Sequence, residues 1–266
     1  MQEKRWKAAL KDLPLGRQYY FDQVNSTNDI AAELLEAGNP AFSLVLADEQ
    51  LEGRGRNARR WITLPGAALA FSVILRPGDG DFTPERMGLL SGLGGVAVCR
   101  ALQKNYALPV DLKWPNDVLI NGKKVAGILA EAHWIGDQLR GVILGIGINV
   151  FPESIPPRAK LNFPSTSVVA EYGNEVSRPI LLANVLTELV DWYPRLNSSD
   201  FLHVWEENLA FKDERVSLRI GEGDYVEGRV LGLNPDGSLR LGIIPGKEQS
   251  FQIGEIHLQP IDISPK

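Results

Sequence analysis

The sequence predicts an α+β protein with a mixed sheet and helices, followed by a small C-terminal β-barrel. Helical and strand-like apolar spacings are interspersed in the first part of the chain, and its middle is a run of strands joined by tight turns. From Asp213 onward, short alternating strands replace this pattern. We therefore expect an N-terminal segment at 1–19, a larger domain at 20–210 and the barrel at 211–266.

The first part of the chain has clear element boundaries. Capping side chains at Ser26 to Asp29 start a helix, and Gly38 and Pro40 end it. Strands follow at Phe42 to Ala47 and at Leu69 to Leu75. A long apolar helix comes next, and its glycines predict close packing against the sheet. The helices after the first are expected at 84–104, 179–196 and 200–209.

The middle of the chain is expected to be a β-meander. Two strands, at Asp117 to Ile120 and at Val125 to Leu129, are separated by Asn121-Gly122, a strong hairpin signal. A turn at Gly136-Asp137 leads into a third strand at Val142 to Val150. The strands of the C-terminal barrel are expected at 215–220, 225–233, 239–244 and 249–253.

The composition is that of a globular protein. Of the 266 residues, 44% are hydrophobic and 23% are charged, which excludes an extensively disordered chain. No stretch approaches about 20 consecutive apolar residues, and no apolar signal core follows Met1, so we expect a cytoplasmic protein without a membrane partner. Cys99 is the only cysteine, which excludes an internal disulfide and a cysteine-based metal cage.

The formal charge of −5 gives no reason to expect general affinity for nucleic acids, so any anion site must be local. Residues 53–60 place four arginines in an otherwise acidic protein. Alternating glycines let the backbone approach a ligand while guanidinium groups reach phosphate or carboxylate oxygens. A solvated basic loop is the alternative. Trp61, directly after it, either anchors the loop to the core or is a core residue.

Three further segments carry polar groups that a core does not need. Residues 113–117 bring a lysine, an amide and a carboxylate together at the end of a strand, which suits a triphosphate and its metal or an ordinary polar turn. Lys124 heads an apolar strand and either points into a site or is solvated. At 145–150, small residues at alternate positions leave one strand face open to a flat ligand or to a helix.

In order and spacing, these segments resemble the biotin–protein ligase family. The matching segments are Ser26-Thr27-Asn28, Gln50, Gly53-Arg54-Gly55-Arg56, Lys113 to Asp117, Lys124 to Glu131 and Gly147 to Val150. The match spans residues 20–150, and the tail from Asp213 is similar to the small C-terminal barrel of the family. One position departs from the pattern, because Ala58 stands where the family usually has glycine, and alanine resists positive φ.

The resemblance implies a class II aminoacyl-tRNA synthetase/biotin ligase-like mixed sheet and an SH3-like barrel. It also implies that biotin and ATP form biotinyl-5'-AMP, and that biotin then passes to a lysine of a biotin carboxyl carrier protein, such as a subunit of acetyl-CoA carboxylase. Members that repress transcription carry a winged helix-turn-helix before the catalytic domain. Only residues 1–19 precede Tyr20, so we expect the enzyme-only type with no DNA partner. The edge strands of the meander are able to pair across a dimer, so the sequence allows either a monomer or a homodimer.

By resemblance, the functional residues fall into overlapping groups. Lys124, Arg56 and Lys113 are implied to be catalytic, and Asp117 to hold Mg²⁺. Biotin is implied to contact Ser26, Thr27, Asn28, Gln50, Gly53, Arg54, Gly55, Arg56, Lys124, Gly127 and Gly147. ATP or the adenylate is implied to contact Arg54, Arg56, Arg59, Trp61, Lys113, Asn116, Asp117 and Asn149.

Two other function classes fit parts of the pattern. A lipoate–protein ligase shares the catalytic logic, although the arginine loop and the small barrel favour biotin. A catalytically silent biotin-sensing or protein-binding module would not need Lys113, Asp117 and Lys124. A repressor is disfavoured by the acidic balance and by the short segment before Tyr20.

Overall fold

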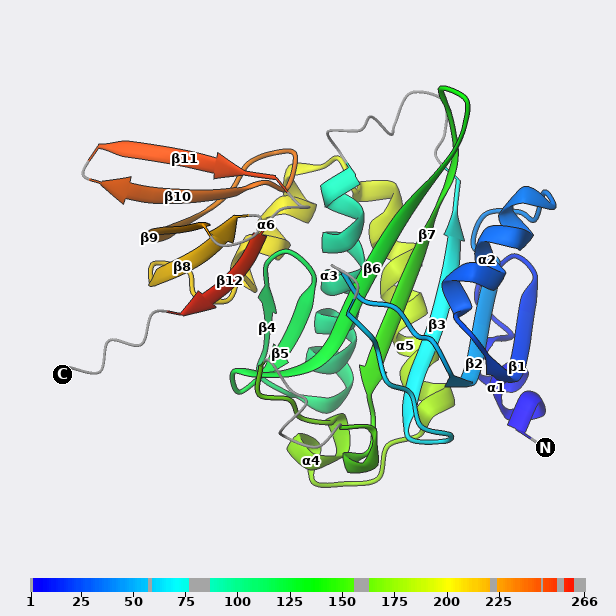
Figure 1. Ribbon diagram of the computed structural model, residues 1–266. Helices are drawn as coiled ribbons and strands as arrows, with labels where there is room; N and C mark the ends of the chain where they lie inside the picture. Colours follow the sequence, from blue (N-terminus) through cyan, green and yellow to red (C-terminus); the bar gives the residue numbers. More distant parts are fainter. Residues whose placement is uncertain are drawn as a thin grey trace.

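The chain forms two sheets with helices on both faces of the larger one (Figure 1). The computed structural model describes residues 2–56, 59–76, 87–155, 163–220, 224–244, 246–252 and 256–260. The seven-stranded sheet has the order β1-β2-β3-β7-β6-β5-β4, and the five-stranded sheet has the order β11-β10-β9-β8-β12. This arrangement confirms the expected mixed sheet followed by an all-β unit.

The larger sheet is mixed. β1 runs parallel to β2, whereas all the other pairs of adjacent strands in this sheet are antiparallel. The consecutive strands β4 to β7 form the predicted meander. Asn121 and Gly122 join β5 to β6 with positive φ values of 50° and 70°. The strand bounds are β1 Gln18–Val24, β2 Leu44–Gln50, β3 Ala68–Leu75, β4 Val110–Lys113, β5 Asp117–Ile120, β6 Lys123–Ile135 and β7 Gln138–Asn149.

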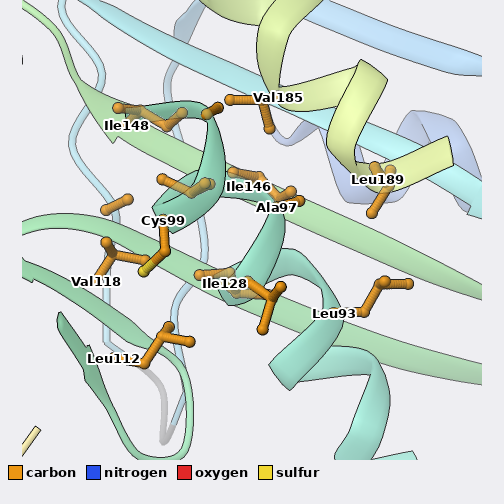
Figure 2. Close-up of a cluster of buried hydrophobic side chains, with 14 of the residues drawn as sticks. Leu93, Ala97, Cys99, Leu112, Val118, Ile128, Ile146, Ile148, Val185 and Leu189 are labelled. Atoms are coloured by element: carbon orange, nitrogen blue, oxygen red, sulfur yellow. The ribbon is translucent and has the colours of Figure 1, made fainter. Parts of the chain in front are cut away.

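Helices cover the two faces of this sheet unequally. On one face, Ala31 and Leu35 of α2 pack against Val45, Ile74 and Ile143. Neighbouring residues of the same strands point to the opposite face, where α3 and α5 bury the main core (Figure 2). The helix bounds are α1 Gln2–Leu10, α2 Thr27–Glu36, α3 Met87–Tyr106, α4 Val168–Tyr172, α5 Arg178–Trp192 and α6 Ser199–Glu207, with 3-10 turns at Pro152–Ser154 and Tyr193–Arg195.

The glycines of α3 allow the close packing that the sequence predicts. A Cβ atom at Gly94 would lie 2.9 Å from Ile128 of β6, and one at Gly92 or Gly95 would overlap Trp205 or Leu112. Bare backbone therefore lets the helix approach the sheet. Cys99 is fully buried in this layer, and burial raises the pKa of its thiol well above the ordinary value.

The smaller sheet is antiparallel throughout and contains one strand more than the sequence suggests. Its strands are β8 Arg215–Ile220, β9 Asp224–Leu233, β10 Leu239–Ile244, β11 Lys247–Phe251 and β12 Ile256–Pro260. The architecture is that of an SH3-like domain. Within the described residues, no helix is both long and apolar enough to cross a membrane.

Several element boundaries differ from the sequence expectations. The strand expected from Phe42 begins at Leu44, because Phe42 has a φ of 57° and ends the preceding turn. The helix expected to reach 196 ends at Trp192, since Pro194 lies in a 3-10 turn that follows it. Residues 84–86, the expected start of the long helix, lie outside the described residues. Helix α1 was not expected, and it packs against α5 through the buried Trp6.

Candidate active site

A cavity opens on the sheet beside the N-terminus of α2, the arginine loop and the turn that joins β4 to β5. Its volume is about 910 Å³ when the open mouth is included. Segments far apart in the sequence meet in its wall. The lining residues expected from the sequence are Ser26, Thr27, Asn28, Gln50, Arg54, Gly55, Arg56, Arg59, Trp61, Lys113, Asn116, Asp117, Lys124, Gly127 and Gly147.

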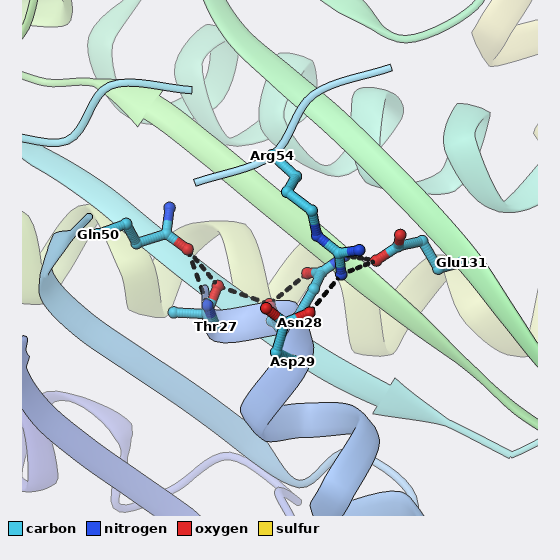
Figure 3. Close-up of polar contacts among 7 residues, drawn as sticks. Thr27, Asn28, Asp29, Gln50, Arg54 and Glu131 are labelled. Atoms are coloured by element: carbon cyan, nitrogen blue, oxygen red, sulfur yellow. Dashed lines mark hydrogen bonds and ion pairs between the residues drawn. The ribbon is translucent and has the colours of Figure 1, made fainter. Parts of the chain in front are cut away.

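Beside the N-terminus of α2, neutral side chains of the cavity wall hydrogen-bond to one another, next to the ion pairs of Arg54 (Figure 3). The backbone N–H of Thr27 donates to Gln50 Oε1 at 2.8 Å, and the Thr27 hydroxyl donates to the same oxygen at 3.0 Å. The Ser72 hydroxyl lies 2.6 Å from Asn28 Oδ1 and 2.8 Å from Thr27 Oγ1. Ser72 was not expected, although a lone serine inside the apolar strand β3 is a signal that could have found it.

Arg54 of the arginine loop is tied to two carboxylates. Its Nη2 atom lies 2.6 Å from Asp29 Oδ1 and 2.9 Å from Glu131 Oε2, as Figure 3 shows. Asn28 donates to the same Glu131 oxygen at 2.6 Å, so the loop, α2 and β6 share one network. Residues 57 and 58 lie outside the described residues, and the consequence of Ala58 therefore stays a prediction.

Arg56 points toward the turn between β4 and β5. Its Nη1 atom donates to Asn116 Oδ1 at 3.3 Å. The Nη2 atom is buried and has no hydrogen-bond partner among the described residues, and burial lowers the pKa of the guanidinium from its ordinary value. A buried guanidinium with an unused donor is prepared to bind an anionic oxygen.

Two lysines from different strands meet at a single carboxylate. Lys124 Nζ lies 2.5 Å from Asp117 Oδ1, and Lys113 Nζ lies 3.9 Å from Asp117 Oδ2. Burial lowers the pKa of Lys113, while the neighbouring Asp117 raises it. With two cations for one anion, this cluster carries excess positive charge and attracts an anionic ligand.

Trp61 and two glycines form the apolar wall. Gly127 and Gly147 face each other on β6 and β7. A Cβ atom at Gly127 would lie 3.2 Å from the indole, and one at Gly147 would overlap it. Bare backbone therefore lets the indole of Trp61 lie close against the sheet. The indole N–H of Trp61 is buried without a hydrogen-bond partner among the described residues.

Two expected residues do not line the cavity. Asn149 is buried at the end of β7, where its side-chain N–H donates to the Thr166 carbonyl at 3.1 Å. Gly53 is also buried, and it accepts from the Trp61 backbone N–H at 2.7 Å. One neighbour of the cluster was missed, because Phe163 holds the Lys113 ammonium 4.2 Å from its ring centroid. No spacing in the sequence links those two residues.

The described residues contain no group of three or more His, Cys, Asp or Glu side chains that could hold a metal ion. Among the described residues that line the cavity, Asp117 is the only carboxylate, and Asn116 adds an amide oxygen. Magnesium is commonly held by one or two carboxylates together with substrate phosphates and waters. The residues therefore fit an ion that arrives with a polyphosphate rather than a resident metal.

Comparisons with known proteins agree with this geometry. A family model described as Biotin/lipoate A/B protein ligase family matches residues 20–149. The bifunctional ligase/repressor BirA of Bacillus spizizenii is 33% identical over 245 residues, which are 91% of this chain and 74% of that protein. The biotin–acetyl-CoA-carboxylase ligase of Paracoccus denitrificans is 31% identical over 242 residues, which are 86% of this chain and 98% of that protein.

A solved structure shares the fold across both sheets. The biotin protein ligase of Aquifex aeolicus, in complex with biotin and ATP, matches with a TM-score of 0.78 at 28% identity and covers 92% of this chain and 99% of that chain. The sheet, the cavity and these likenesses define a protein of the biotin and lipoate ligase class. Within that class, the chain belongs to the biotin–protein ligase family.

The Arg54 network predicts how firmly the arginine loop is held. In Glu131→Ala, Arg54 and Asn28 lose a shared acceptor, so we expect faster tryptic cleavage after Arg54 and Arg56. The measurement is limited proteolysis with mass spectrometry. Glu49→Ala is the matched control, since that carboxylate accepts from Gln23 instead. Equal cleavage rates in both variants and the parent protein would show that the contact does not hold the loop.

Proposed function

We propose that this chain is an ATP-dependent biotin–protein ligase, which joins biotin to a lysine of a biotin carboxyl carrier protein, such as a subunit of acetyl-CoA carboxylase. The observation that carries the proposal is the make-up of the cavity in this member of the family. Neutral hydrogen-bonding side chains and a cluster of cations line the same cavity. Biotin matches both parts, since it has a neutral ureido ring at one end and a carboxylate at the other.

The chemistry requires two steps, because a carboxylate does not acylate an amine at neutral pH. First, a biotin carboxylate oxygen attacks the α-phosphorus of ATP, and the bond from that phosphorus to the bridging oxygen breaks to release pyrophosphate. The product is biotinyl-5'-AMP, a mixed anhydride. The acceptor amine then attacks the biotinyl carbonyl, the bond to the phosphate oxygen breaks, and AMP leaves. Both steps concentrate negative charge, which fixed cations stabilise.

Lys124 and Arg56 are positioned to stabilise that charge. In this proposal, the ammonium of Lys124 exchanges part of its contact with Asp117 for oxygens of the biotin carboxylate and the α-phosphate. The unused Nη2 donor of Arg56 supports binding to the same group. Arg54, Gly53 and Gly55 hold the loop over the intermediate and limit its hydrolysis by water.

The buried pocket suits the ureido ring. Ser26, Thr27, Asn28 and Gln50 offer donors and acceptors without net charge, and all but Gln50 are less than 5% exposed. Gly127 and Gly147 form a flat wall for the apolar thiophane ring, beside the Trp61 indole. Contacts that are already mutually satisfied also keep these side chains oriented.

Lys113, Asn116 and Asp117 are assigned to the triphosphate. When bound, Mg²⁺ would neutralise phosphate charge there, with Asp117 and the Asn116 amide oxygen as its protein ligands. Arg59 and Trp61 line the same cavity and are assigned to the adenylate. Asn149 is assigned an indirect role in binding the adenylate. Its side-chain amide donates to the carbonyl of Thr166, and the Thr166 N–H donates to the backbone carbonyl of Lys124 at 2.9 Å.

A lipoate–protein ligase is the nearest alternative. Lipoate lacks a ureido ring, so it offers the neutral side chains at the N-terminus of α2 no hydrogen-bonding group in exchange for their present contacts. The net charge of −5 gives no support to general DNA binding.

The direct test is to incubate the pure protein with MgATP, a biotin-acceptor domain and either biotin or lipoate, and to weigh the acceptor. We expect one biotinyl group per acceptor domain and no lipoylation. An acceptor whose mass is unchanged by biotin would refute the proposal, and modification by lipoate alone would assign the protein to the alternative.

Replacing Lys124 should separate binding from chemistry. Lys124→Ala removes a cation needed mainly in the transition state, so we expect measurable biotin binding but adenylate formation slower by about 10²–10³-fold. Single-turnover release of pyrophosphate and calorimetry with biotin measure the two quantities. Lys123→Ala is the matched control, because Lys123 pairs with Glu171 outside the cavity. Unchanged pyrophosphate release in Lys124→Ala would contradict the role.

The lowered pKa of Lys113 predicts an alkaline limit on the use of ATP. The Lys113 side chain attracts phosphate only while its amine is protonated. As the pH rises through the pKa of Lys113, which lies below the ordinary 10.5, kcat/KM for ATP should therefore fall. Lys113→Arg should move this fall to higher pH, because a guanidinium stays charged there. An alkaline limb at the same pH in both proteins would exclude Lys113 as its source.

A further inference from the structure

Trp114 connects the catalytic cavity to the C-terminal barrel. It lies between Lys113 and Pro115 in the turn that joins β4 to β5, and its side chain is 1% exposed. Its indole N–H donates to the carbonyl of Gly237 at 3.0 Å. A side chain in the cavity wall is thus hydrogen-bonded to a turn of the barrel, 123 residues further along the chain.

The barrel turn that accepts this bond is held by several hydrogen bonds of its own. Gly237 has a φ of 80°, and a Cβ atom there would lie 2.9 Å from Trp205. Asp236 Oδ1 accepts from both the backbone N–H and the hydroxyl of Ser238, at 2.9 and 2.6 Å. Asn234 donates to the same hydroxyl at 2.8 Å. The Gly237 carbonyl is therefore a fixed acceptor rather than a mobile loop atom.

The strand that carries Lys113 is held from the same side. β4 is one of the two edge strands of the large sheet. Its Leu112 N–H donates to the Asn208 carbonyl at 2.6 Å, and the Leu112 carbonyl accepts from Ala210 N–H at 2.9 Å. Glu206 of α6 in turn accepts from the N–H of Leu233 in β9 at 2.6 Å. The segment that leads into the barrel thus pairs with β4, and α6 is bonded to the barrel itself.

The opposite end of the turn is fixed by the sheet. The Asn116 side chain donates to the Ile128 carbonyl at 2.7 Å, and the Ile128 N–H donates to the Asn116 carbonyl at 2.9 Å. Lys113 and Asp117, which pair with each other at the ends of β4 and β5, therefore flank a short turn that is bonded to β6 and, through Trp114, to the barrel. Within the described residues, the side chains of Thr27, Asn28 and Gln50 hydrogen-bond to one another or to Thr63, Ser72 and Glu131, which all lie outside the barrel.

We propose that the barrel turn at residues 234–238 positions the Lys113–Asp117 cluster through Trp114, so that the barrel sets the affinity for ATP without touching it. The inference rests on the proposed function and deepens it. Trp114 is a positioning residue, because its indole N–H acts through the backbone of its neighbours. Loss of this bond lets one anchor of the turn move, which misplaces the lysine for phosphate but leaves the biotin pocket intact.

Two variants test the link from its two sides. Trp114→Phe removes the indole N–H and keeps an aromatic ring, and Asp236→Ala removes the acceptor that holds the barrel turn. Glu248→Ala, an exposed carboxylate on β11, is the matched control within the barrel. The readout is biotin-dependent exchange of pyrophosphate into ATP, from which KM values for MgATP and for biotin are obtained separately, with thermal unfolding of each variant.

We expect the KM for MgATP to rise about tenfold in both test variants, with the KM for biotin changed less than about twofold and Glu248→Ala behaving like the parent protein. Equal rises in both KM values would overturn the proposal, because a general loss of structure moves both. A rise confined to Trp114→Phe would overturn it too, since the effect would then be local to the ring. Should Asp236→Ala fail to fold, Ser238→Ala replaces it.

Failure of the proposed function gives a different result. If the parent protein shows no biotin-dependent exchange, the ligase assignment fails. The positioning role is then measured by the rise in unfolding temperature that MgATP causes. A smaller rise in Trp114→Phe and Asp236→Ala than in Glu248→Ala supports the role, and equal rises in all three refute it.

Discussion

The pairing of two lysines with a single carboxylate is the interaction on which the site depends. Lys113 and Lys124 come from different strands, and Asp117 is the only carboxylate among the described residues of the cavity wall. Partly buried cations are costly without a counter-ion, so Asp117 keeps the two ammonium groups in place while leaving net positive charge for a ligand. The meander from β4 to β7 meets this requirement by bringing the three residues together through short, rigid connections.

The same sheet also separates the two kinds of recognition. At one end, α2 and β3 supply buried neutral groups that hydrogen-bond to one another, and at the other end, the turn between β4 and β5 supplies charge. The paired glycines of β6 and β7 lie between them beneath Trp61. A molecule with a neutral polar head, an apolar body and an anionic end therefore has one favourable orientation in the cavity. This polarity favours an orientation in which the anionic end lies next to the cations, as the proposed reaction requires.

Much of this arrangement could be predicted from the sequence, because it depends on local signals. Asn121-Gly122 identified the hairpin, and the glycines of α3 identified its close packing. The basic residues in three separated segments predicted an anion site, and the structure brings those residues together around one cavity. The contacts that were missed are long-range. Nothing near Ser72 indicates that its hydroxyl meets Asn28, and nothing near Phe163 indicates that it covers Lys113. The bond from Trp114 to Gly237 likewise depends on how the barrel packs.

The central claim is that lysines from separate strands act on one anion. It is tested most directly by calorimetry of the biotin-bound protein with a non-hydrolysable analogue of MgATP and the variants Lys113→Met, Lys124→Met and their combination. The account predicts that each single change weakens binding by about tenfold or more, and that the double variant departs from additivity by more than about 0.5 kcal/mol. Unchanged affinity, or strictly additive losses, would contradict it, because independent effects mean that the two ammonium groups do not share a ligand.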